Sequence, residues 1–154
     1  YLCRGGIQHL KSLTTLHLSF DGSNRITNTG FQILCREGIK HLKSLNSLHI
    51  NLNASRGEIS DEGIQSLFCE GIQDLELNRL QIIFHDQDRI TDKGLKIIAS
   101  EGVLRLSRIN DLQFSFPQPL KFSFSIYQAY LTILSYFGFE TNENPLALSN
   151  NSQT

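Results

Sequence analysis

Two histidines, His17 and His49, come closest in this sequence to the residue types and spacing of a metal site. They lie 32 residues apart, at equivalent places in two copies of a short recurring stretch described below. An imidazole nitrogen is a common zinc ligand. A zinc site needs three or four ligands, and at the equivalent place in the next such segment stands Gln81, which is a poor ligand. The sequence therefore favours two solvated polar residues of a binding surface, and we expect no metal and no cofactor.

The three cysteines, Cys3, Cys35 and Cys69, are interpreted as recurring at the same place in each repeat. Their odd number gives no closed set of disulfides. We interpret them as small apolar residues that point into the interior, rather than as metal ligands, because a buried thiol packs like a small hydrophobic side chain. Reduced thiols fit an intracellular compartment, so we expect the protein to be cytoplasmic.

Other features that could support catalysis are incomplete. No serine or cysteine stands with a paired base at matching positions, and no glycine-rich phosphate loop is present. Asp86 and Asp88 resemble half of a calcium loop, but the glycine and glutamate that such a loop requires are missing. We therefore predict a protein that is not an enzyme and has no catalytic residues.

The charge balance also limits the kinds of partner. Fifteen acidic and fourteen basic residues give a formal net charge of −1. A nucleic-acid-binding domain normally carries a basic stripe, and attraction to an anionic membrane surface needs clustered lysine or arginine. The composition argues against both kinds of partner. From the repeats described below we expect a protein partner, whose identity the sequence does not give.

One short stretch recurs four times and organises the chain. Its central leucines, Leu16, Leu48, Leu80 and Leu112, recur with a fixed 32-residue period, and a period of this size is typical of stacked repeats. Apolar and polar residues alternate within each stretch, which indicates a half-buried strand. In the first stretch this alternation places Leu16, Leu18 and Phe20 on the inner face.

Parallel stacking of such strands places residues one period apart side by side, about 4.8 Å from strand to strand. The outward residues then form three rows, which we predict to line a concave, partner-binding face: Thr15, Ser47, Arg79 and Asp111; His17, His49, Gln81 and Gln113; and Ser19, Asn51, Ile83 and Ser115. Arg79 and Asp111 are neighbours in one row, so we expect them to pair.

A helix is predicted between successive strands. Thr27 is a suitable N-cap, and apolar residues then follow at helical spacing, which predicts a helix over about 28–43. Glycines recur late in these helices, at Gly38, Gly71 and Gly102. Close approach of helix to sheet explains them best, and a break in each helix is the alternative. The order of strand, loop and helix predicts an α/β fold, a right-handed βα solenoid with a parallel sheet on the concave face and helices outside, over 1–117.

Two segments carry a resemblance to a known family: Leu77-x-x-Leu80-x-Ile82, and Ile90-Thr91-Asp92-Lys93-Gly94-Leu95. The pattern, over roughly 1–116, resembles leucine-rich repeats of the long, ribonuclease-inhibitor-like class. This resemblance implies a protein-binding scaffold. Two features depart from the family pattern. The period exceeds the usual 20–29 residues, and the place of the family's asparagine ladder is held by Asp21, Asn53 and His85.

Two alternative functions remain open. The motif Ile-Thr-Asp-x-Gly is similar to the cysteine-containing repeats of F-box adaptors. This resemblance implies the substrate-recognition arm of a ubiquitin-ligase adaptor. A leucine-rich GTPase-activating regulator is the other alternative, although the polar constellation that it would need near the N-terminus is not found. Flanking sequence would separate these functions, and we expect the chain to be part of a longer protein because it begins at Tyr1 and contains no methionine.

After the fourth strand the pattern stops at Pro117-Gln118-Pro119. We predict that 118–139, which is apolar and includes an uncharged run from Phe122 to Phe139, caps the open end of the solenoid. The alternatives are a membrane span, against which the interrupting serines argue, and a segment that packs on sequence outside this chain. For 140–154, rich in Asn, Ser and Thr, we predict a disordered tail.

Overall fold

The structure, a computed structural model, describes residues 6–20, 26–52, 59–84, 89–103, 105–106 and 108–115. Several predicted features lie outside these residues: Cys3, the post-strand positions Asp21, Asn53 and His85, the pair Asp86 and Asp88, the capping segment 118–139 and the tail 140–154.

Four strands form one parallel sheet in the order β1-β2-β3-β4. They are β1 (Thr15–Ser19), β2 (Ser47–Asn51), β3 (Arg79–Ile83) and β4 (Asp111–Ser115). Leu16 pairs with Leu48, Leu48 with Leu80, and Leu80 with Leu112, so the register follows the 32-residue period. The predicted strands and their parallel register are confirmed.

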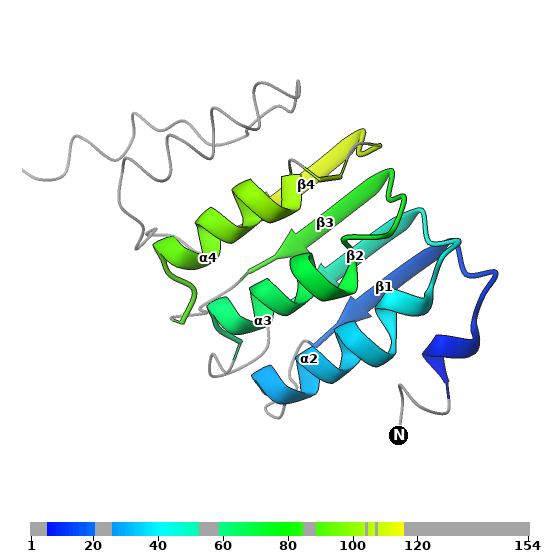
Figure 1. The fold of residues 1–154 in the computed structure, drawn as a ribbon, viewed down its shortest axis with the longest axis horizontal. Coiled ribbons are helices and arrows are strands. Elements are labelled where there is room, and N and C mark those ends of the chain that lie inside the picture. Colours follow the sequence, from blue (N-terminus) through cyan, green and yellow to red (C-terminus); the bar gives the residue numbers. More distant parts are fainter. Residues whose placement is uncertain are drawn as a thin grey trace, which may run out of the picture.

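Three helices lie side by side over one face of the sheet (Figure 1). They are α2 (Asn28–Glu37), α3 (Asp61–Ser66) and α4 (Asp92–Ile97). Short 3-10 turns, η1 (Ile7–His9) and η2 (Ile39–His41), precede β1 and β2, whereas π-helical segments, η3 (Leu67–Gly71) and η4 (Ile98–Val103), continue α3 and α4. The fold is therefore α/β, as predicted.

We call each strand, together with the helix that follows it, a unit. Each α-helix begins at a hydroxyl side chain, and these N-caps also join neighbouring units. The predicted N-cap Thr27 accepts a hydrogen bond from the backbone N–H of Gly30 at 3.1 Å. Asn28 then donates from Nδ2 to Oγ of Ser60, the N-cap of α3, at 2.6 Å, and accepts from the Ser60 backbone N–H at 2.9 Å. Asp61 accepts the equivalent pair of bonds from Thr91, the N-cap of α4. Side chains at the first position of one helix thus satisfy the start of the next helix, where backbone donors have no partner within the helix.

The predicted helix over 28–43 is wrong at its C-terminal end. α2 ends at Glu37, and Gly38 takes φ −117° and ψ −82°, after which the chain continues as the 3-10 turn η2. The alternative of a helix break therefore holds at Gly38.

The predicted approach of helix to sheet is wrong at the later glycines. A Cβ added at Gly71 would lie 3.2 Å from Cβ of Cys35, and one added at Gly102 would lie 2.5 Å from Cδ1 of Phe68. Cys35 lies in α2 and Phe68 in η3, which are the helical segments one repeat earlier. These glycines therefore let neighbouring helical segments approach one another, and they do not serve the approach of helix to sheet.

The core lies between the sheet and the helices. The inner strand residues Leu48, Ile50, Leu80 and Ile82 are fully buried against the helices. Cys35 is buried, as predicted. The prediction is wrong for Cys69, which is half-buried because Phe68 takes the inward position; partial burial raises the pKa of the Cys69 thiol. Both side chains are reduced thiols.

Candidate functional site

The face of the sheet turned away from the helices carries the three predicted rows of side chains. The strand register places the members of each row on adjacent strands, which confirms the predicted neighbours. All twelve are exposed or half-buried, whereas the inner residues of β2 and β3 are buried. We call these twelve residues the strand face: Thr15, His17, Ser19, Ser47, His49, Asn51, Arg79, Gln81, Ile83, Asp111, Gln113 and Ser115.

His17 and His49 lie in contact at the centre of β1 and β2, with their rings tilted to one another. Their ring centroids are 3.9 Å apart, with an angle of 37° between the ring planes. Partial burial lowers the pKa of His49, and the neighbouring His17 lowers it further, while a hydrogen bond with the Gln81 side chain acts in the opposite direction. The neutral imidazole is therefore the preferred state of His49 at neutral pH.

This arrangement predicts a loss of stability as the solution becomes acidic. His49 has a lower pKa in the folded state than in the unfolded chain, so the unfolded state binds more protons around and below pH 6.5. The stabilising contribution is complete above that pH and is lost as pH falls through the folded pKa. We expect the urea midpoint to fall between pH 7.5 and 5, and to fall less in His49→Gln.

The direct measurement is an NMR titration of the His49 ring, which should show a midpoint below that of a free histidine. In His17→Gln the midpoint should move upward but remain lowered, because burial is the larger cause. A His49 midpoint at or above the ordinary value in the intact protein would contradict this account.

Arg79 and Asp111 form the predicted ion pair of the strand face. Nε of Arg79 lies 2.7 Å from Oδ2 of Asp111, and Gln113 donates from Nε2 to Oδ1 of the same carboxylate at 3.2 Å. The Arg79 side chain is 64% exposed, so the pair contributes only about 0–1 kcal/mol to stability. Its guanidinium and carboxylate edges are available for contacts with a partner.

The chemistry of the strand face is that of hydrogen bonding. Imidazole, amide and hydroxyl groups both donate and accept, and they stand on strands that fix their spacing. In the described part of the chain, no group of three or more His, Cys, Asp or Glu side chains is placed to hold a metal ion. Within the same ranges, no helix has the length and apolar character that crossing a membrane requires.

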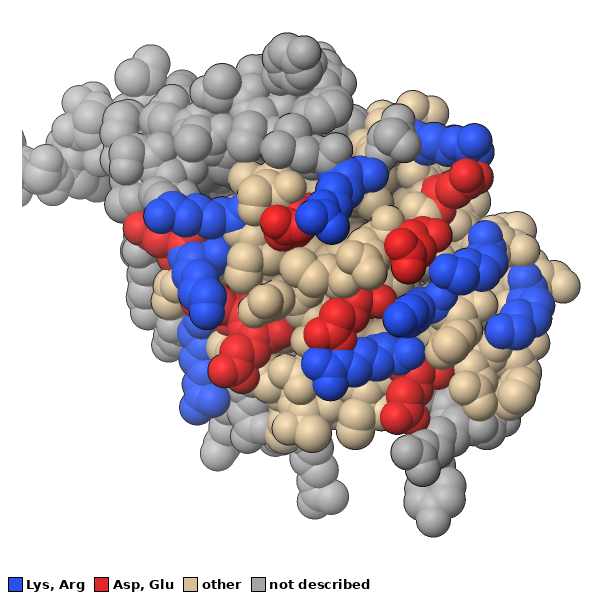
Figure 2. All heavy atoms as spheres, in the orientation of Figure 1, with Lys and Arg blue, Asp and Glu red and all other residues tan. Residues whose placement is uncertain are grey.

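The helix side of the molecule differs in charge from the strand face. Figure 2, drawn from the helix side, shows basic and acidic side chains interspersed over α2, α3 and α4. Outside the strand face, ion pairs join Arg36 with Glu70, Arg108 with Glu76 at 2.6 Å, and Arg105 with Glu101 at 2.7 Å. Such a surface of mixed charge is typical of a solvated exterior.

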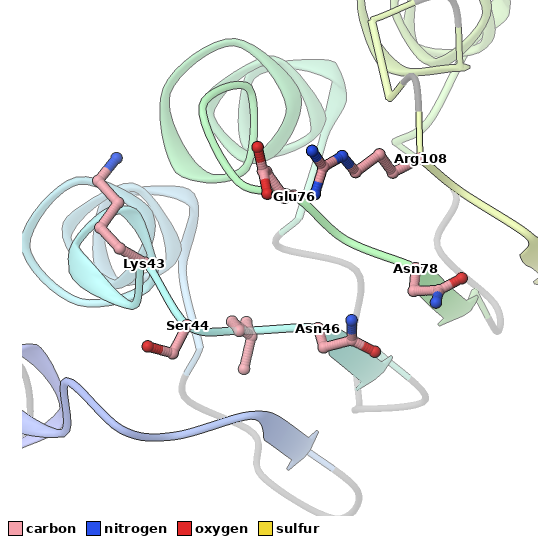
Figure 3. A pocket seen from close by; sticks show the side chains of 7 residues that line it. Lys43, Ser44, Asn46, Glu76, Asn78 and Arg108 are labelled. Carbon is pink, nitrogen blue, oxygen red and sulfur yellow. Dashed lines mark hydrogen bonds and ion pairs between the residues drawn. The ribbon is translucent and has the colours of Figure 1, made fainter.

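A polar pocket of about 290 Å³ lies at the edge of the sheet where the chain enters β2 and β3. Figure 3 shows Asn46 and Asn78 on adjacent segments, with the paired side chains of Glu76 and Arg108 nearby. Seven residues line it: Lys43, Ser44, Leu45, Asn46, Glu76, Asn78 and Arg108.

This pocket was not predicted from the sequence, although a periodic signal was present. Asn46, Asn78 and Asn110 recur with the period of the strands and stand directly before them. The backbone carbonyl of Asn46 accepts from the N–H groups of Asn78 at 2.8 Å and Arg79 at 3.1 Å, and the carbonyl of Asn78 is used in the same way by the next unit. The backbone there is satisfied between units, which leaves the amide side chains of Asn46 and Asn78 to face the pocket.

Comparison of the sequence with models of protein families and with curated proteins, and of the fold with solved structures, gave no match.

Proposed function

We propose that this chain is a non-catalytic protein-interaction module, built as a right-handed βα solenoid of the leucine-rich-repeat, ribonuclease-inhibitor-like kind. Its strand face is the concave surface that binds a protein partner in the cytoplasm. Repeats of this kind commonly use that surface, because it presents side chains from successive units at regular spacing.

The observation that carries the proposal is the set of in-register rows on the strand face. His17, His49 and Gln81 stand side by side on β1, β2 and β3, exposed or half-buried, although the alternate residues of each strand face the helices. The Arg79–Asp111 pair adds little to stability, so recognition explains it better than folding does. No large aromatic anchor stands among these twelve residues, which favours modest affinity.

The test is capture of binding proteins from an extract of cells that produce this protein. Arg79→Glu on the strand face should lower the amount of captured partner at least about tenfold, the size expected when one anchoring contact is lost. His49→Glu should do the same. Circular dichroism should show both variants folded, because the two side chains are not part of the core.

Matched controls lie on the helix side. Lys96→Glu changes the charge by the same amount as Arg79→Glu at an exposed site of α4, and Lys40→Glu does so in η2. These controls should retain the partner. Loss of the partner in the helix variants but not in the strand variants would show that the strand face is not the binding surface.

A further inference from the structure

We infer that the flank of β1 and α2 is an interface for one more strand-helix unit of the same 32-residue pattern, joined through Tyr1 and stacked in parallel register. This inference concerns assembly of the fold, and it does not depend on the proposed binding role of the strand face.

The first evidence is uncovered apolar surface. Among the described residues, Leu10 and Ile33 are the exposed large hydrophobic side chains, at 50% and 44%. Their counterparts in the next unit, Leu42 and Ser66, are 0% and 3% exposed. The inward residues in and just after β1 are likewise only partly buried, while the equivalent residues of the next unit are buried: Leu16, Leu18 and Phe20 against Leu48, Ile50 and Leu52.

The second evidence is the glycine near the start of each helix. A Cβ at Gly63 would meet Oδ1 of Asn28 at 2.9 Å, and one at Gly94 would meet Oδ1 of Asp61 at 2.5 Å. Both contacts come from the preceding unit. At Gly30 the nearest atoms belong to Ile26 and Thr27 of its own unit, each at 3.6 Å. Among the described residues, none fills the space beside Gly30 that a preceding helix occupies at Gly63 and Gly94.

These contacts also indicate which residues the added unit needs at the start of its helix and in its strand. Asn28 and Asp61 each hold the N-cap of the following helix through a backbone N–H and a hydroxyl. The added unit needs an Asn or Asp at the start of its helix to reach Thr27 in the same way. Its strand needs apolar residues opposite Leu16 and Leu18, because those are the positions that pair in every other unit.

The sequence before η1 continues the pattern. Leu2 and Cys3 hold the positions of Leu34 and Cys35, one period earlier, and Tyr1 likewise falls one period before Ile33. A unit attached at Tyr1 would therefore arrive in register. β1 itself carries no charged residue and no proline, the features with which proteins usually protect an exposed strand edge.

The experiment adds a copy of residues 15–32 directly before Tyr1 of the full chain, which keeps the 32-residue spacing. We expect the melting temperature to rise by about 5 °C or more, since each stacked unit adds an interface. Amide exchange of β1 should slow in the extended chain. A control with the same insertion, in which the copies of Leu16 and Leu18 are aspartate, should show neither change.

Two results would overturn the inference. One is an extended chain with the melting temperature and β1 exchange of the original. The other is a dimer of the original chain in sedimentation that Leu18→Lys converts to monomer, since the flank would then be covered by a second copy.

Discussion

Replacing Leu48 by alanine should lower the free energy of unfolding by about 2–5 kcal/mol. Leu48 is fully buried in the central part of the sheet, where it is flanked by Leu16 on β1 and Leu80 on β3. Truncation removes the transfer free energy of the lost methyl groups and leaves a cavity that neighbouring strands on both sides prevent from closing. Urea unfolding monitored by circular dichroism measures the change.

The adjacent position supplies the control, because alternation along β2 turns His49 to the opposite face. His49→Ala at pH 7.5 should cost less than about 0.5 kcal/mol, as is usual for a substitution outside the core. Similar losses in the two variants would mean that the inner and outer faces of the strand have been assigned wrongly.

The strand face could be predicted from sequence because the side chains of a strand alternate and the strands themselves recur at a fixed spacing. Together these fix both the direction of each side chain and its neighbour on the next strand. His17 beside His49 and Arg79 beside Asp111 follow from counting alone, and the register confirms both. The same counting predicts the four parallel strands.

The ends of the helices could not be predicted so closely. A hydrophobic pattern over 28–43 does not distinguish one long helix from an α-helix followed by a 3-10 turn, since both place the same residues inward. It also does not reveal the π-helical segments that follow α3 and α4.

The prediction for Cys69 failed because the helices do not keep the strict period of the strands. Gly63 stands one residue later in its unit than Gly30 does in the preceding unit. The same offset makes Phe68, rather than Cys69, the residue equivalent to the buried Cys35. Counting residues from the start of each helix, instead of from the strands, would have revealed this offset.

The polar contacts between units were missed for a different reason. Asp61 fits its helix by charge alone, because an acidic side chain is favourable in a first helical turn. Its bonds to Thr91 depend on the stacking of two helices, which local pattern does not describe. The recurrence of Asn28, Asp61 and Asp92 directly after a Thr or Ser was the available signal. The pocket at Asn46 and Asn78 was missed for the same reason, because it also forms between neighbouring units.

An added methyl group at the contact between neighbouring helical segments should also lower the free energy of unfolding. In Gly102→Ala the new Cβ would lie 2.5 Å from Cδ1 and 2.6 Å from Cε1 of Phe68. The Phe68 ring is 1% exposed, so it has no route into solvent, and relief requires that the two segments move apart. We expect a loss of about 1–3 kcal/mol in the free energy of unfolding, which is the usual range for overpacking a core.

Gly30→Ala is the matched comparison. Among the described residues, the new Cβ there meets Ile26 and Thr27 at 3.6 Å, an ordinary contact distance. Alanine is the better helix former by up to about 1 kcal/mol, so this variant should be neutral or more stable than the original in urea unfolding. Opposite signs at Gly30 and Gly102 follow only if Gly102 is required by the neighbouring segment. Equal effects would mean that both glycines act through backbone freedom, and that Phe68 does not set the spacing between units.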